Sequence, residues 1–316
     1  MTVHRRPDFV IVGAMKSGTT SLHHWLSGLP GVYMPPGEGQ LYSVDDIEEN
    51  PVYFPRIDGR WTVQDFRAFE PVYRRWYGER LAGAGPDQLL GEDAPSYLSS
   101  AQAIQRLAQD APDTRLIVLL RDPVDRLYSH YWHHVRSFRA SLRLEDMLRW
   151  APGVLLKRSS YAEQLDRLHR YFDPSQIKVL LFENMCADPD GAVASVASFL
   201  GVEAPPNLVD TTRRSNPGLF PRSLSLALLR NRLFRQRYGI RYLRSGPRMP
   251  LAVTARPRPL SLRVLNRMIG WGPRNPHPRD PDTEAMLGTV LRNLNEGLDE
   301  RLELDLSAVW PSWRQS

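Results

Sequence analysis

The sequence predicts an α/β fold in which a central parallel β-sheet is flanked by helices. Three observations support this fold class. Residues 9–12 are a short, β-branched apolar run, which is typical of a buried parallel strand. A turn of small residues and a helical pattern follow at once. Further apolar runs then alternate with helical patterns, as the strands and helices of a parallel sheet do.

The composition is that of a globular protein with an anionic partner. The chain has 316 residues, of which 42% are hydrophobic and 24% charged. This length is ample for one large core, and we expect a single domain over residues 1–316 with a basic, proline-rich insertion at 222–281, possibly on the acceptor side. The net charge of +6 is compatible with nucleic acid, but an anionic cofactor or substrate explains it equally well. The charge alone thus gives no reason to invoke nucleic acid, and we expect no nucleic-acid partner.

The single cysteine, Cys186, excludes an internal disulfide and any cysteine-based zinc site. One free cysteine fits a reducing cytosol. No apolar signal-peptide segment precedes the first strand, and no stretch approaches the ~20 apolar residues of a membrane span. These features predict a cytoplasmic protein without a transmembrane segment.

The first strand leads into a predicted phosphate-binding loop. Gly13 ends the strand, residues 16–20 (Lys-Ser-Gly-Thr-Thr) form a turn, and 21–26 begin the first helix. Free backbone N–H groups and the helix dipole make such a turn a cradle for phosphate. The lysine precedes the glycine, unlike in the ordinary P-loop. Because the chain has only three lysines, keeping one here suggests that a compact ammonium group is required.

A loop rich in proline and glycine follows a short strand at residues 32–33. It covers 34–46 and contains Glu38, a candidate general base near the phosphate loop in sequence. The ordinary alternative is a solvated loop glutamate. A helical pattern then spans 63–77, within a segment expected on the substrate side.

Two rival carboxylates end the next apolar run. Glu92 and Asp93 follow Leu89–Leu90, at the carboxyl end of a predicted strand. Carboxylates at that end face the ligand crevice of an open α/β sheet. The sequence therefore leaves the base open among Glu38, Glu92 and Asp93.

The clearest central strand spans residues 115–120 and ends at Arg121. Asp122 can cap the next helix, and Pro123 suits its first position. Arginine binds phosphate through two parallel hydrogen bonds, and a hydroxyl such as that of Ser129 adds a neutral donor.

Three histidines follow on the same helix. His130 and His134 have the i, i+4 spacing of a metal pair, but no third ligand accompanies them. We expect His130, His133 and His134 to be surface or packing residues, and we predict no metal.

The rest of the chain continues the alternation. We expect helices at 157–172, 188–200, 224–238 and 283–302 and a strand at 177–182, with Gly201 ending one helix and an irregular run after 238.

Two of these motifs resemble those of sulfotransferases that use 3′-phosphoadenosine-5′-phosphosulfate (PAPS). The run KSGTT resembles their 5′-phosphosulfate loop, and RDPVDRLYSHYW resembles their second motif, Arg-x-Pro-x-x-Arg-x-x-Ser-x-Tyr. The endings FLGV and LDLSAVW also resemble the family. The resemblance is closest to carbohydrate (heparan-sulfate-type) and bacterial sulfotransferases. It implies a P-loop, nucleotide-kinase-like sulfotransferase fold.

The resemblance assigns roles to individual residues. It implies that PAPS is the donor, that adenosine 3′,5′-bisphosphate is the product, and that no metal is needed. Arg121 and Ser129 would hold the 3′-phosphate, and Arg213 or Arg214 would close over the nucleotide. The residues that it places at the 5′-phosphate or near the cofactor are Lys16, Ser17, Gly18, Thr19, Thr20, Ser21 and Tyr161.

The resemblance also favours Glu38 as catalytic base beside Lys16. Relatives have Lys-Glu-x-His-aromatic-Phe where this chain has Gly37-Glu38-Gly39-Gln40-Leu41-Tyr42, so the glutamate is kept while the lysine and histidine are replaced. The segment GEDAPSYL resembles the family's Glu-x-Thr/Ser-Pro-x-Tyr and keeps Glu92 and Asp93 as rivals.

The implied reaction moves a sulfuryl group to a hydroxyl, less favourably an amine, of a carbohydrate, lipid or natural-product acceptor, including glycans and glycolipids. Two alternatives remain at this point. One is a nucleotide kinase, although the Gly-Lys-Ser/Thr order is missing. The other is a non-catalytic polyanion-binding protein that uses the arginines of 213–279.

Overall fold

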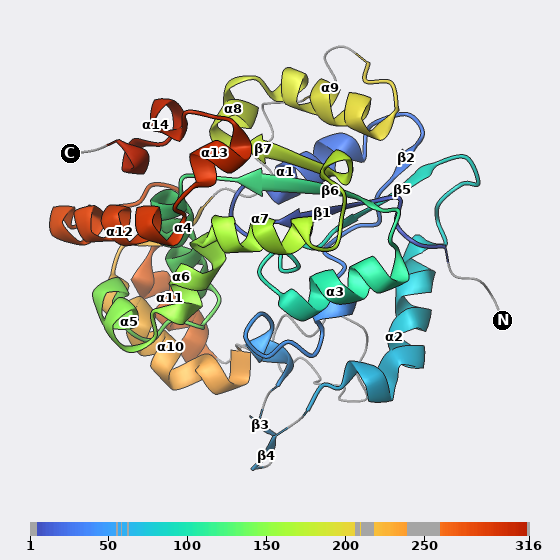
Figure 1. The fold of residues 1–316 in the computed structure, drawn as a ribbon. Coiled ribbons are helices and arrows are strands. Elements are labelled where there is room, and N and C mark those ends of the chain that lie inside the picture. The colour runs from blue at the N-terminus through green and yellow to red at the C-terminus, as the bar shows by residue number, and fades with distance from the viewer. Residues whose placement is uncertain are drawn as a thin grey trace.

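The computed structural model describes residues 5–314 apart from 55, 58, 62, 206–208, 210–217 and 239–259. Its centre is a five-stranded parallel sheet with the order β2-β5-β1-β6-β7 (Figure 1). Its strands are β1 (Phe9–Gly13), β2 (Val32–Tyr33), β5 (Leu89–Asp93), β6 (Arg115–Leu120) and β7 (Ile177–Leu181). All five were predicted, and the α/β fold class with a central parallel sheet is confirmed.

Helices connect and flank these strands. The α-helices are α1 (Thr19–Leu26), α2 (Phe66–Leu81), α3 (Ala101–Asp110), α4 (Pro123–Arg136), α5 (Leu144–Trp150), α6 (Gly153–Leu156), α7 (Tyr161–His169), α8 (Phe182–Ala187), α9 (Pro189–Leu200), α10 (Leu224–Tyr238), α11 (Leu260–Ile269), α12 (Pro281–Leu294), α13 (Leu298–Leu302) and α14 (Leu306–Val309). Short 3₁₀ helices are η1 (Leu41–Ser43), η2 (Pro51–Tyr53), η3 (Lys157–Ser159), η4 (Pro174–Gln176) and η6 (Pro311–Trp313).

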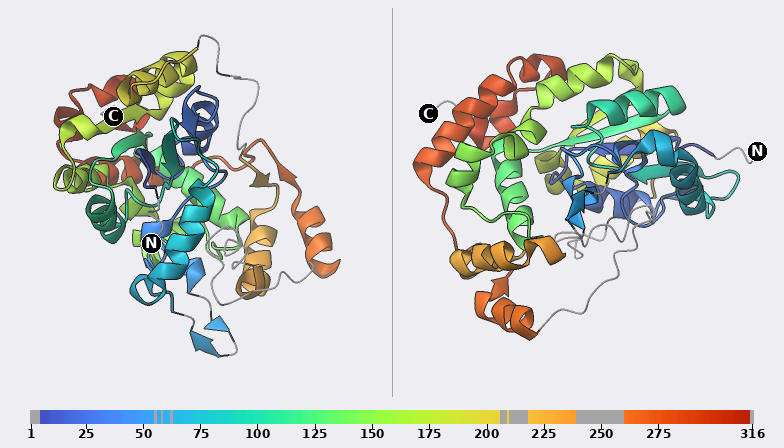
Figure 2. Two further views of the ribbon diagram at one scale, coloured as in Figure 1. Left: turned by 90° about the vertical axis from the view of Figure 1, so that its right-hand side faces the viewer. Right: turned by 90° about the horizontal axis from the view of Figure 1, so that it is seen from below.

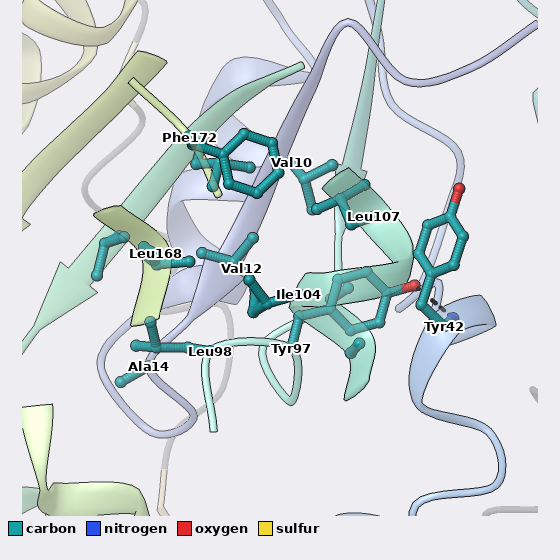
Figure 3. Packing of buried hydrophobic residues seen from close by; sticks show 14 of the residues in the cluster. Val10, Val12, Ala14, Tyr42, Tyr97, Leu98, Ile104, Leu107, Leu168 and Phe172 are labelled. Atoms are coloured by element: carbon teal, nitrogen blue, oxygen red, sulfur yellow. Dashed lines mark hydrogen bonds between the residues drawn. The ribbon is translucent and has the colours of Figure 1, made fainter. Parts of the chain in front are cut away.

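The sheet is buried on both faces because the side chains of each strand alternate between two cores. Val10 and Val12 of β1 point into a core that α3 and α7 cover, where Ile104, Leu107 and Leu168 meet them (Figure 3). Phe9 and Ile11 point into the opposite core, which α1 and α9 cover. Burial on both faces explains why the strands are continuous apolar runs.

Side-chain caps fix where several helices begin. The carboxylate of Asp122 accepts hydrogen bonds from the backbone N–H groups of Val124 and Asp125, and Pro123 occupies the first turn of α4. Asp188 caps α9, which ends at Gly201 in the left-handed conformation. The predicted start of α4 and end of α9 are both confirmed.

Three predicted helices differ in their limits. The segment 157–172 is divided into η3 and α7 at Ser160. The segment 283–302 is divided into α12 and α13, because the chain takes a positive φ of 73° at Gly297. The helix expected over 63–77 runs from Phe66 to Leu81 and begins at the Asp65 cap.

In its described residues, 222–238 and 260–281, the insertion contains more regular structure than the sequence predicted. Strands β8 (Phe220–Pro221) and β9 (Trp271–Gly272) pair antiparallel and bring its two ends together. The prediction of an irregular run after Tyr238 was wrong for residues 260–269, which form α11. Helices α10 and α11 lie side by side at one side of the molecule (Figure 2). A second hairpin, β3 (Arg56–Ile57) with β4 (Arg60–Trp61), was not predicted either.

None of the helices in the described part of the chain is both long and apolar enough to cross a membrane.

Candidate functional site

The site lies where the strand order of the sheet reverses direction. From β1 the chain first builds β2 and β5 on one side, and then β6 and β7 on the other. Ligands of open α/β sheets bind outside the carboxyl ends of the strands at such a point. The predicted phosphate loop follows β1 there, and Arg121 follows the neighbouring strand β6.

The phosphate loop has a backbone that only glycine can adopt at its end. Gly18 has φ of 90° and is the N-cap of α1. A Cβ atom there would lie 2.7 Å from the ring of Phe182. No side chain caps α1, so the first N–H groups of the helix remain available to an anion. Ser17 and Thr19 are buried within the loop, Ser21 is partly exposed and Thr20 is exposed.

Arg121 lies against this loop. Its guanidinium donates to the carbonyl of Lys16 (Nη1–O, 3.4 Å) and contacts Asp125 (Nη2–Oδ2, 3.4 Å). Its carbon atom Cζ is 4.8 Å from the ring centroid of Phe182. The Nε atom of Arg121 is buried and has no hydrogen-bond partner among the described residues. An orphaned cationic donor beside an uncapped helix start is an arrangement that fits an anion.

Tyr161 lies beneath the surface and holds the backbone of Arg121 in place. Its side chain is fully buried, and its hydroxyl donates to the backbone carbonyl of Arg121 at 2.9 Å. Ser129 lies one turn after Asp125 on α4 and is partly exposed. In the described part of the chain its hydroxyl forms no hydrogen bond. Arg213 and Arg214 lie outside the described residues.

The loop that carries Glu38 is held onto the end of β5 and onto α2. The N–H of Gly39 donates to the carbonyl of Asp93 at 2.8 Å. Arg80 of α2 donates to the carbonyls of Pro36 (3.0 Å) and Gly37 (2.8 Å). Gly39 itself has no room for a side chain, because a Cβ atom would lie 1.6 Å from Oε1 of Glu92. These contacts fix the backbone of residues 36–39 against β5 and α2.

Lys16 and Glu38 perturb each other electrostatically. The pKa of Lys16 is lowered to about 8, because burial and then the charge of Arg136 lower it by more than the charge of Glu38 raises it. Burial raises the pKa of Glu38, whereas a hydrogen bond from Gln40 (2.9 Å) and the charge of Lys16 lower it. The structure thus places the ammonium group of Lys16 and the carboxylate of Glu38 within electrostatic reach of each other.

Glu92 is enclosed instead of facing the site. It is fully buried, and the hydroxyls of Tyr77 and Tyr97 both donate to its carboxylate. Asp93 is 3% exposed, and burial followed by the charge of Glu38 raises its pKa well above the ordinary value. Its Oδ2 atom lies 3.7 Å from Nδ1 of His23.

The predicted histidine pair packs inside the protein. His130 and His134 are buried, and their Nε2 atoms are 2.8 Å apart. Burial lowers the pKa of both rings well below the ordinary value, so they are neutral at pH 7. Of the two alternatives expected for these histidines, surface or packing residues, His130 and His134 are packing residues. His133 is partly exposed and lies within electrostatic reach of Lys16, which lowers its pKa after burial.

Three arginines that the sequence did not single out as site residues act on the same two groups. Arg136 lowers the pKa of Lys16, while Arg139 and Arg158 lower that of Glu38. Arg158 is held by an ion pair with Glu49 (2.6 Å). The signal for Arg136 and Arg139 was present in the sequence: Arg136 is the last residue of α4, the helix that carries Ser129, and Arg139 follows three residues later.

The fold and site define an α/β protein with an uncapped strand–turn–helix loop, an arginine after the neighbouring strand, and a carboxylate whose charge acts on the loop lysine. The sequence pattern of the Sulfotransferase family matches residues 7–206, which is more than half of the chain. The chain therefore belongs to the sulfotransferase family.

Known proteins similar to this chain include enzymes named for heparan sulfate. Human heparan sulfate glucosamine 3-O-sulfotransferase 6 is 29% identical over 210 residues, which is 63% of this chain and 53% of the relative. Human bifunctional heparan sulfate N-deacetylase/N-sulfotransferase 3 is 26% identical over 214 residues, which is 64% of this chain and 23% of the relative. The chain thus spans about half the length of the first relative and less of the second.

Among solved structures, the sulfotransferase from Alicyclobacillus acidocaldarius has the same fold. The TM-score is 0.60 at 23% sequence identity, and the match covers 96% of this chain and 98% of the other.

Proposed function

We propose that this protein transfers a sulfuryl group from PAPS to an acceptor hydroxyl, less favourably an amine, and releases adenosine 3′,5′-bisphosphate. The observation that carries the proposal is the position of Lys16. It lies in an uncapped phosphate loop, next to Arg121 and within electrostatic reach of Glu38. Family membership supports the same reaction class.

The donor would be held by its two phosphate groups. Of the backbone N–H groups of residues 17–21, which the resemblance assigns to the 5′-phosphate, those of Ser17 and Ser21 donate to the carbonyls of Ala14 and Gly18, and those of residues 18–20 suit the phosphate best. Arg121 and Ser129 suit the 3′-phosphate, and the unpartnered Nε of Arg121 supports that role. Tyr161 would act by holding Arg121 in place through its carbonyl. The contribution of Arg213 and Arg214 stays a prediction from the resemblance.

In the transfer step, the sulfur–oxygen bond to the 5′-phosphate breaks while a bond to the acceptor oxygen forms. Lys16 compensates the negative charge that develops on the departing phosphate oxygen. Glu38 takes the proton of the acceptor hydroxyl. Sulfuryl transfer resembles phosphoryl transfer in its loose transition state, so positioning and charge stabilisation supply most of the catalysis.

We propose that the acceptor is a carbohydrate or a carbohydrate-like lipid or natural product. The heparan sulfate named for the relatives supports a glycan. We further propose that residues 1–316 act as one sulfotransferase domain, which the coverage of the Alicyclobacillus acidocaldarius structure supports. That the reaction needs no metal stays a prediction, and turnover in the presence of EDTA would test it.

Calorimetry and radiolabel transfer together test the proposal. Adenosine 3′,5′-bisphosphate should bind without metal and much more tightly than AMP or ATP, because each charge-assisted contact to the 3′-phosphate contributes ~1.5–3 kcal/mol. Incubation with [³⁵S]PAPS and a panel of desulfated glycans and glycolipids should label at least one acceptor. Preference for ATP with magnesium would favour the nucleotide-kinase alternative. Tight binding without transfer to any acceptor would favour a non-catalytic polyanion-binding protein.

A further inference from the structure

The helices of the insertion expose large apolar side chains next to arginines. We call this region the α10–α11 surface. On α11, Leu260, Val264 and Met268 are 73%, 50% and 63% exposed, and on α10 Leu233 is 65% exposed. The other exposed members of the surface are Leu229, Arg232, Arg263 and Arg267.

The spacing on α11 gives the helix two apolar faces. Leu262 and Ile269 are fully buried, and they hold α11 against the rest of the molecule. Leu260, Val264 and Met268 recur every fourth residue and form a continuous stripe that faces solvent. A soluble helix normally keeps that face polar. An exposed stripe with a regular helical period indicates a surface that binds something apolar.

The charge around this stripe has one sign. From residue 211 to residue 279 the sequence has sixteen arginines and no aspartate, glutamate or lysine. Arg263 and Arg267 lie on the exposed side of α11, and neither forms a hydrogen bond or ion pair with any described residue. An apolar stripe bordered by unpaired arginines is the pattern of a helix that lies in the headgroup region of an anionic bilayer.

The α10–α11 surface is attached by hydrogen bonds to the end of α4, the helix that follows Arg121. Arg230 of α10 donates to the carbonyl of Val135 near the end of α4 (2.6 Å) and to the side chain of Asn266 on α11 (3.1 Å). Asn231 donates to the same Val135 carbonyl at 2.9 Å. The end of α4 also carries Arg136, which acts on Lys16. The two helices are adjacent and lie at one side of the fold (Figure 2).

We propose that the α10–α11 surface binds the anionic headgroup region of a lipid bilayer, with Leu260, Val264 and Met268 inserted and Arg263 and Arg267 on the phosphates. A soluble polyanion such as nucleic acid or a sulfated glycan would use the arginines but not the apolar stripe. A second copy of the chain would bring two surfaces of the same charge together. A bilayer with anionic lipids uses both features. Because α10 packs on α4, binding would also bring a lipid-borne acceptor near the site.

Sedimentation with vesicles tests the proposal without donor or acceptor, so its outcome does not depend on sulfuryl transfer. The protein should sediment with vesicles of phosphatidylcholine and phosphatidylglycerol, and much less with phosphatidylcholine alone. The triple variant Leu260→Ser, Val264→Ser, Met268→Ser should lower the partition coefficient at least ~10-fold. Arg263→Ser and Arg267→Ser should each lower it roughly fivefold.

Matched controls lie on other helices. Val72→Ser, Met286→Ser and Leu294→Ser replace the same three residue types at positions 46%, 44% and 43% exposed. Arg75→Ser and Arg170→Ser remove exposed arginines elsewhere. All of these variants should bind vesicles as the unmodified protein does. Circular dichroism of each variant separates loss of binding from loss of folding.

A fluorescent probe tests insertion directly. In a Cys186→Ser background, an environment-sensitive dye at Val264→Cys should shift to shorter wavelength on anionic vesicles, whereas the same dye at Met286→Cys should not. Equal sedimentation with neutral and anionic vesicles would overturn the proposal. Full binding by the apolar triple variant would overturn it in favour of a soluble polyanion. Dimerisation that the triple variant abolishes, without vesicle binding, would assign the surface to a second copy.

Discussion

Glu38 and Glu92 are both neighbours of Gly39, one in sequence and the other in space, and they differ in what surrounds each carboxylate. Glu92 ends β5 and receives hydrogen bonds from two buried tyrosine hydroxyls. Glu38 lies on a loop and is partly exposed, and the charges of Lys16, Arg158 and Arg139 lower its pKa. Exposure and the nearby positive charges favour Glu38 as the base, although Glu92 has the position at the end of a strand that made it a rival in the sequence.

The comparison also explains why the two residues cannot exchange roles. Tyr77 and Tyr97 satisfy the two oxygens of Glu92, and removing that carboxylate would leave buried hydroxyls without acceptors. Glu38 accepts one side-chain hydrogen bond, from Gln40. It therefore keeps lone pairs for a proton from an acceptor. We infer that Glu92 supports the loop that carries Glu38.

We expect the largest loss of activity when Lys16, whose charge acts on Glu38, is replaced. Lys16→Ala should lower kcat on the order of 1,000-fold, since the lysine charge matters most when the sulfur–oxygen bond breaks. Lys16→Arg should also fail, because the planar guanidinium does not replace a point charge in a tight loop. Single-turnover transfer from [³⁵S]PAPS measures both. Unchanged turnover in Lys16→Ala would remove Lys16 from the transfer step.

Comparing the variants Glu38→Gln and Glu92→Gln tests directly whether the two glutamates have different roles. Glu38→Gln keeps the shape and removes the basicity, so kcat should fall at least ~100-fold while affinity for adenosine 3′,5′-bisphosphate is unchanged. Glu92→Gln should change kcat within ~3-fold and lower the free energy of unfolding by about 1–3 kcal/mol. Turnover and urea unfolding distinguish the two. If Glu92→Gln or Asp93→Asn loses turnover and Glu38→Gln does not, the base belongs on β5.

A smaller effect, on binding instead of chemistry, is expected at Arg121. Arg121→Ala should weaken adenosine 3′,5′-bisphosphate by ~10- to 100-fold and leave AMP nearly unaffected, because only the bisphosphate has the 3′ group. Calorimetry with both nucleotides measures the difference. Ser129→Ala should act in the same direction with a smaller loss. Equal weakening of AMP would place Arg121 on the 5′-phosphate.

The sheet and the phosphate loop could be predicted because local sequence determines them. The strands are apolar runs covered on both faces, and Gly18 is required by its own backbone and by Phe182. The environment of Glu92 could not be predicted, since its partners come from α2 and from the turn after β5. The burial of His130 and His134 depends likewise on packing against distant segments.

The structure of the insertion, residues 222–281, could not be predicted in full from local sequence either. Helix α11 follows a proline-rich stretch, and its apolar residues lie on two faces, so no single amphipathic pattern identified it. The β8–β9 pair joins residues about fifty positions apart, which local patterns do not indicate. A cytoplasmic location stays a prediction that rests on the single cysteine.

The smallest expected effect is a dependence of activity on pH. It tests the roles of Lys16 and Glu38, because each affects the pKa of the other. Lys16 must be protonated and its pKa is about 8 in the free protein, so kcat/KM should fall to about half of its plateau near pH 8 and continue to fall above it. Bound phosphates favour the ammonium form, so the alkaline limb of kcat should lie at higher pH than that of kcat/KM. Burial raises the pKa of Glu38, so the acid limb should lie above the ordinary glutamate value of ~4.3.

Variants assign each limb of that profile to its residue. The residual activity of Lys16→Arg should lack the alkaline limb, because arginine stays charged throughout. The residual activity of Glu38→Gln should lack the acid limb. The charge of Glu38 raises the pKa of Asp93, so Asp93 is already protonated when Glu38 titrates, and Asp93→Asn should leave the acid limb nearly in place. If Glu92→Gln, and not Asp93→Asn, moved the acid limb, Glu92 would be electrostatically part of the site, and the separation between the two glutamates would be wrong.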